Sequence, residues 1–244
     1  MPELSALAFA AIVTVSLLGS AVTAAFSIGG GLLLIGVMSA LMPAAAVIPV
    51  HAVIMLGSNA GRSALLFRHV TWRVLVWFAG GAALGGFLGA KEVFGLEPRV
   101  LRLAVAGFIL FTQWGPAIAL PLGAPFFAVA GGLSMFLTLF VGASGPFITA
   151  ILARMPELSR LALIGTAGAC MTLQHGGKVG IFALGGFAYT PWLTLMAAAV
   201  AAGFIGTFLG TRLLHRLDEA VFRHGLKIVL TGLAGWLILL GLTG

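Results

Sequence analysis

Charged residues are scarce in this chain, and acidic residues are the scarcest. Only 8% of the 244 residues are charged and 61% are hydrophobic, whereas soluble domains carry about 25% charged residues. No polar stretch is long enough to build a soluble domain, so the composition predicts an integral membrane protein. The net charge of +7 would suggest nucleic acid in a soluble protein, but Lys and Arg are enriched in the cytoplasmic loops of membrane proteins. We therefore expect the lipid bilayer as a partner and no nucleic acid.

The few acidic residues also constrain the chemistry of the membrane core. All six fall at the ends of apolar segments or in loops, so there is no carboxylate for an intramembrane proton relay or cation site. We expect no metal and no other cofactor. The charges that do lie within apolar segments are positive, which favours a small anionic substrate. The single Cys170 excludes an intrachain disulfide.

Apolar segments of membrane-spanning length, roughly 20 residues, recur along the whole chain. The expected spans cover residues 4–26, 46–67, 72–90, 100–119, 122–141, 159–183, 190–211 and 224–242. Two further apolar segments, 27–44 and 142–157, are too short to span and begin at glycine clusters. The sequence therefore predicts an all-α integral membrane fold of about eight transmembrane helices with two broken or re-entrant half-helices.

The glycine clusters at the two short segments are candidate anion sites. A helix that begins inside the membrane exposes free N–H groups and the positive end of its dipole, and both attract anions. Paired breaks of this kind in two halves of a chain point to a transporter's binding site. The alternative is a kinked helix whose glycines merely pack. The candidate donors are Ser27, Gly29, Gly30, Gly31, Ser144 and Gly145.

An internal repeat accompanies the paired breaks. The stretch 85–89 recurs at 206–210, a shift of 121 residues, and Gly31 pairs with Gly145 at a shift of 114. We expect two four-span transmembrane repeats, residues 1–120 and 121–244, parallel in the membrane and forming one integral membrane domain. Small residues repeat at four-residue intervals at 81–89 and 202–210, a spacing that lets helix backbones approach closely. We expect them to pack helices and not to bind ligand.

Arg62 and Lys178 occupy matching repeat positions within apolar spans. A charge in the membrane usually marks a substrate or ion path, although a long side chain near a span end can also extend to the headgroups. The same two spans carry further polar residues that either bind the ligand or join neighbouring helices. These residues are His51, Asn59, Gln174 and His175.

The cations are unevenly divided between the two expected membrane faces. One face receives Arg68 and Arg73, and the other receives Lys91, Arg99, Arg102, Arg154, Arg160, Arg212, Arg216, Arg223 and Lys227. The cation-rich face should be cytoplasmic, which places both termini on the opposite, outer side.

The glycine run 27–31 after the first span, its counterpart Gly142–Pro146 and the duplicated eight-span layout resemble the TauE/SafE family, also called TSUP. The resemblance covers essentially the whole chain. It implies a transporter that moves sulfite, an organosulfonate or a related sulfur oxyanion across the inner membrane, frequently outward. Export suits the membrane potential, because an anion leaving a negative-inside cell gains about 2.3 kcal/mol per 100 mV.

Two other functions remain open at this level. The residues Gly142–Gly145 also resemble the G-x-S-G signature of rhomboid intramembrane proteases, with Ser144 as nucleophile and His175 as base. The separation of 31 residues leaves room for roughly one span, whereas rhomboids place two there, so we expect no enzyme. An anion channel is the other alternative, and a homodimer is left open.

Overall fold

The computed structural model describes residues 4–26, 29–91, 97–115, 123–142, 144–152, 155, 157–213 and 219–243. Every regular element in these residues is a helix. The α-helices are α1 (Ala6–Phe26), α2 (Gly30–Leu41), α3 (Ala44–Leu65), α4 (Trp72–Ala90), α5 (Pro98–Trp114), α6 (Ala124–Val141), α7 (Gly145–Leu152), α8 (Arg160–Leu184), α9 (Leu193–Leu213) and α10 (Glu219–Thr243). Two 3₁₀ turns, η1 (Phe67–His69) and η3 (Thr190–Trp192), precede α4 and α9.

The long helices follow the expected spans closely. Each expected span corresponds to one long helix, and their ends agree to within five residues. Within the described residues, α1, α3, α4 and α9 together with η3 are long and apolar enough to cross a membrane. The apolar parts of α5, α6 and α10 are shorter, and α8 carries several polar residues in its middle. The all-helical class is thus confirmed, together with four of the membrane-length helices.

The two short helices also lie where glycine clusters predicted them. Helix α2 has 12 residues and α7 has 8, which correspond to about 18 Å and 12 Å of rise. Both are shorter than the roughly 30 Å hydrocarbon core of a bilayer. The break before α2 includes Gly29 at φ 98°, and the break before α7 includes Gly142 at φ 82°. Only glycine adopts such angles without strain, so the clusters allow the chain to leave one helix and begin another.

Helix α4 packs closely along α6. A Cβ atom on Gly81 would collide with the backbone of Ala128, and one on Gly85 with the backbone of Gly132. The glycines therefore permit a backbone-to-backbone approach that any larger residue would block. This confirms that the first small-residue series packs helices.

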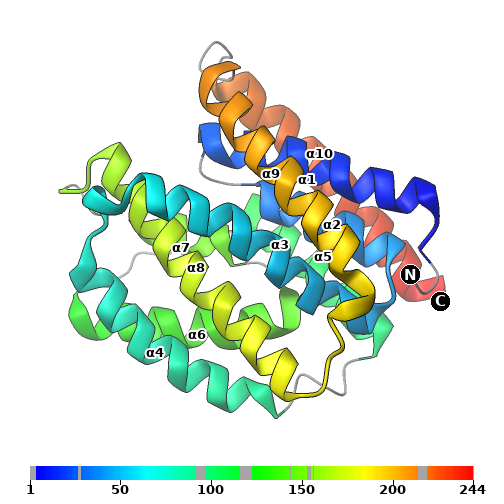
Figure 1. Ribbon diagram of the computed structural model, residues 1–244, viewed down its shortest axis with the longest axis horizontal. Coiled ribbons are helices and arrows are strands. Elements are labelled where there is room, and N and C mark those ends of the chain that lie inside the picture. The colour runs from blue at the N-terminus through cyan, green and yellow to red at the C-terminus, as the bar shows by residue number, and fades with distance from the viewer. Residues whose placement is uncertain are drawn as a thin grey trace.

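The second series does the same between α9 and α1. A Cβ atom on Gly206 would collide with the backbone of Leu17, and one on Gly210 with the backbone of Ala21. In Figure 1, α4, α6 and α8 occupy one side of the molecule, and α1, α9 and α10 occupy the other. Helix α3 packs against α8, and it also contacts α2 and α9.

Candidate functional site

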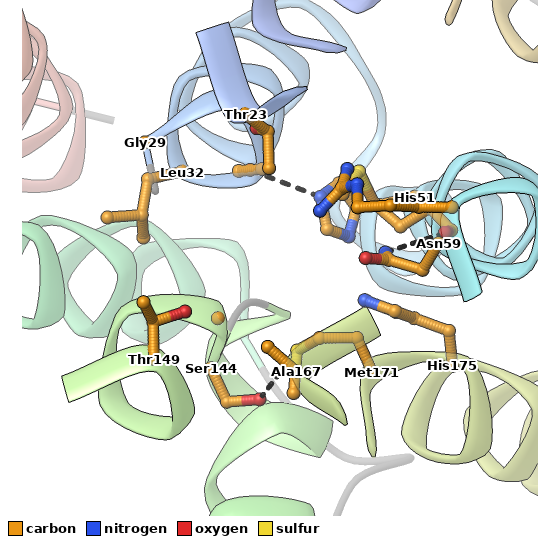
Figure 2. A pocket seen from close by; sticks show the side chains of 14 residues that line it. Thr23, Gly29, Leu32, His51, Asn59, Ser144, Thr149, Ala167, Met171 and His175 are labelled. Carbon is orange, nitrogen blue, oxygen red and sulfur yellow. Dashed lines mark hydrogen bonds between the residues drawn. The ribbon is translucent and has the colours of Figure 1, made fainter. Parts of the chain in front are cut away.

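The N-terminal ends of the two short helices meet a cavity between α3 and α8. Its volume is about 40 Å³, which exceeds the ~10–15 Å³ that one water molecule needs. Figure 2 shows side chains from these helices pointing toward a common space. The lining residues are Thr23, Gly29, Gly31, Leu32, His51, Met55, Asn59, Arg62, Ser144, Gly145, Thr149, Ala167, Met171 and His175.

Most of the residues expected at an anion site lie on this cavity. Eight of them line it: Gly29, Gly31, His51, Asn59, Arg62, Ser144, Gly145 and His175. Ser27 lies outside the described residues. The other three expected residues, Gly30, Gln174 and Lys178, are absent from the described lining.

The end of α2 presents backbone donors to the cavity. The first hydrogen bond of the helix runs from the Leu33 N–H to the Gly29 carbonyl at 2.9 Å. The N–H groups of residues 30–32 therefore have no acceptor within the helix. Gly30 itself faces α1, where a Cβ atom would collide with the Gly19 carbonyl. The absence of a side chain at Gly30 therefore brings α2 against α1.

The end of α7 is held by a chain of polar side chains. The Ser144 hydroxyl donates to Gln174 Oε1 at 2.7 Å, and Gln174 Nε2 donates to Ser134 Oγ at 2.7 Å. The hydroxyl hydrogen of Ser144 is thus directed away from a ligand. Gln174 on α8 thus links α6 to the start of α7, and joining helices was one of the two roles expected for it. What α7 offers the cavity is the dipole and backbone of its first turn at Gly145.

Arg62 brings a positive charge to the cavity from α3. The side chain is only 7% exposed, so it is buried within the protein. Within the described part of the chain, Nε and Nη2 have no hydrogen-bond partner. A buried guanidinium with unused donors is costly unless an anion or water satisfies it. Arg62 is also the one charged side chain among the described lining residues.

Lys178 occupies the matching position of α8 but has a different environment. The residue is fully buried, and its Nζ donates to the Gly142 carbonyl at 2.6 Å and to Thr138 Oγ1 at 3.2 Å. Gly142 is the C-cap of α6, where the carbonyl groups lack intrahelical partners and a cation is favourable. In this structure Lys178 therefore caps α6 and is absent from the described lining of the cavity.

Two histidines and an asparagine complete the polar lining. His51 Nε2 lies 3.2 Å from the Gly31 carbonyl, and its ring meets that of His175 edge-on, with centroids 5.8 Å apart. Asn59 Nδ2 donates to the Met55 carbonyl on its own helix at 2.8 Å. Figure 2 shows His51 and Asn59 on one side of the space and His175 opposite them.

The serine–histidine pair of a protease is not assembled. The Ser144 hydroxyl is donated to Gln174, and no hydrogen bond joins Ser144 to His175 among the described residues. Nucleophilic activation needs that contact. The arrangement therefore does not favour the rhomboid-like alternative.

Several lining residues were not anticipated from the sequence. Met55 and Met171 line the cavity from matching positions of α3 and α8, one turn before Asn59 and His175. Their pairing in the repeat, combined with the helical spacing of four residues, would have identified them. Thr23 and Thr149 come from α1 and α7, and no pattern in the sequence distinguishes them from other membrane threonines.

A scan against protein-family models matches residues 12–237 to the family described as sulfite exporter TauE/SafE. No curated protein and no solved structure gives a significant match. The family model spans nearly the whole chain, and several helices are long and apolar enough to cross a membrane. The chain is therefore a multi-pass membrane protein that belongs to the TauE/SafE sulfite exporter family, the family that its glycine clusters resemble.

Proposed function

We propose that the chain exports a small sulfur oxyanion, sulfite or an organosulfonate, and binds it in the cavity between α3 and α8, where α2 and α7 begin. The observation that supports this most strongly is Arg62, whose Nε and Nη2 are buried on the cavity without partners in the described residues. An oxyanion accepts several hydrogen bonds from a guanidinium and from helix N-terminal N–H groups at once. Family membership supplies the class of substrate.

The transport mechanism that we propose uses two repeats, residues 1–120 and 121–244, of four spans and one half-helix each. The packing supports this division, because equivalent helices make equivalent contacts. Helix α1 packs on α9 as α6 packs on α4, and α3 contacts α9 as α8 contacts α4. The cavity lies where both repeats contribute a half-helix. Movement of one bundle against the other around this site would give alternating access.

The proposed direction is outward across a bacterial inner membrane, with both termini in the periplasm. The distribution of Lys and Arg over the expected loops supports this orientation. Export of a monoanion also follows the membrane potential.

Binding to purified protein tests the proposal. Sulfite and methanesulfonate should raise the thermal unfolding temperature of the wild-type chain, because a ligand stabilises the state that it binds. Arg62→Gln should weaken sulfite binding roughly tenfold to a hundredfold, since hydrogen bonds to a charged group contribute about 1.5–3 kcal/mol. Arg68→Gln is the matched control, because Arg68 is exposed on η1.

Equal sulfite affinity in wild type and Arg62→Gln would refute the assignment of this cavity. Counterflow in proteoliposomes, in which unlabelled sulfite on one side drives labelled sulfite across, would distinguish a carrier from the channel alternative. A flux that does not saturate and shows no counterflow would contradict alternating access.

A further inference from the structure

The hydrogen-bond partner of His51 fixes which ring nitrogen carries its hydrogen. Nε2 lies 3.2 Å from the Gly31 carbonyl, and a carbonyl oxygen only accepts. Nε2 must therefore be the donor. In the neutral ring Nδ1 then carries a lone pair and accepts. His51 is fully buried, and Nδ1 has no partner in the described residues.

His51 and Arg62, which both line the cavity, thus bring an acceptor and donors that are unpartnered in the described residues to one site. Arg62 is the one charged side chain in the described lining, so a single negative charge on the ligand balances it. A ligand that satisfies both groups carries one negative charge and also a hydrogen that it can donate. A dianion without a hydrogen, such as sulfate, would place an oxygen lone pair against the lone pair of Nδ1.

We propose that His51 selects protonated monoanions, with Nδ1 accepting a hydrogen bond from the ligand while Arg62 binds its charge. This inference rests on the proposed function and narrows it to hydrogensulfite over the sulfite dianion, sulfate and methanesulfonate. An organosulfonate fulfils the same requirement when its own hydroxyl or ammonium group reaches Nδ1. The selection follows the general rule that a site built to hydrogen-bond a group rejects the analogue that lacks it.

Among the other ionisable groups around His51, Lys178 and Arg62 only donate, and within the described residues no carbonyl fixes the tautomer of His175. His175 faces it edge-on from α8, and its Nδ1 also lacks a partner among the described residues, but no carbonyl fixes its tautomer there. Lys178, on the same helix, is engaged with Gly142. Arg62, on the same helix as His51, only donates. No acidic side chain lines the described part of the cavity.

The test compares two anions of similar size at two pH values, using the purified full chain. Sulfite is mainly hydrogensulfite below neutral pH and mainly the dianion above it, whereas methanesulfonate remains a monoanion without a donor at both. Below neutral pH, wild type should prefer sulfite over methanesulfonate by about tenfold, the cost of one unpaired buried group. Above neutral pH this preference should disappear, while the affinity for methanesulfonate stays unchanged.

Variants assign the effect to His51. His51→Phe removes the acceptor and should abolish the preference below neutral pH. His51→Gln retains an N–H group for the Gly31 carbonyl and an oxygen that accepts, so it should keep the preference. His69→Phe changes an exposed histidine on η1 and should behave as wild type.

The outcomes separate this inference from the proposed function. Equal binding of both anions by wild type, or an unchanged preference in His51→Phe, overturns the selection while leaving anion binding in place. Failure of wild type to bind either anion overturns both. If His51→Phe does not fold, the pH dependence of wild type and the behaviour of His51→Gln still decide the matter, because a preference that persists above neutral pH contradicts the proposal.

Discussion

Arg62 on α3 and Lys178 on α8 are matched by the internal repeat expected from the sequence, yet the two cations have different environments. Lys178 donates to the Gly142 carbonyl and to Thr138, so its charge stabilises the C-terminal end of α6. Arg62 lines the cavity with Nε and Nη2 unpartnered in the described residues. Lys178 thus caps a helix, whereas Arg62 has donors that a ligand can use.

The chemistry of the two side chains suits this division. An ammonium is a compact point charge that one carbonyl and one hydroxyl satisfy well, whereas a guanidinium offers five N–H donors in a rigid fork. An oxyanion matches that fork better than a carbonyl does. The comparison teaches that a repeated cation in a membrane protein need not have a repeated role.

The largest expected effect on stability comes from removing the cap. Lys178→Met should lower the free energy of unfolding by about 1.5–3 kcal/mol, because it leaves the Gly142 carbonyl buried without its charged donor. Thermal unfolding of the purified chain measures this. Arg62→Met is the matched variant and should not lower the unfolding temperature, since it removes no hydrogen bond within the described residues. Equal destabilisation by both substitutions would contradict the assignment of a structural role to Lys178 alone.

A smaller effect is expected at the break that Lys178 caps. Gly142→Ala forces an L-residue to φ 82° and places its Cβ atom 2.6 Å from Ile35 Cδ1. The cost should be about 1–2 kcal/mol from the left-handed backbone, with the contact to Ile35 adding to it. Gly145→Ala provides the control, because its Cβ atom would meet nothing closer than Met171 Sδ at 3.9 Å. A Gly142→Ala variant as stable as Gly145→Ala would contradict the observed backbone.

The smallest effect concerns Ser144, which precedes α7. Ser144→Ala should cost about 1 kcal/mol of stability, because Gln174 Oε1 loses its donor. Sulfite affinity should remain within a factor of two or three of wild type (a free-energy change of roughly half a kcal/mol), since the hydroxyl hydrogen already serves Gln174. Titration of both proteins with sulfite measures this. A loss of affinity as large as that of Arg62→Gln would show that Ser144 turns toward the ligand.

The sequence predicted the helices and their breaks well, because hydrophobic length and glycine clusters act locally. Residues 27–44 and 142–157 were expected to hold half-helices, and α2 and α7 lie within them. Polar residues on two apolar spans also indicated the cavity that Arg62, His51 and His175 line. These properties follow from composition and spacing alone.

The direction in which each side chain points could not be predicted from the sequence. Arg62 and Lys178 have the same position in the expected repeat and both have a long cationic side chain. Lys178 has a different role because the Gly142 carbonyl lies within its reach. Gly30 and Gln174 likewise face neighbouring helices and are absent from the described lining. Such orientations depend on which helices pack together, and α4 with α6 and α1 with α9 are pairings between distant segments.

The pairing of α1 with α9 has a consequence for the order of assembly in the cell. The Ser16 hydroxyl donates to the Ala199 carbonyl at 2.7 Å across 183 residues of sequence. Helix α1 is therefore synthesised well before α9, the helix against which it packs. Until α9 follows, the surface of α1 that receives Gly206 and Gly210 lacks this partner, so premature termination before α9 would remove that contact.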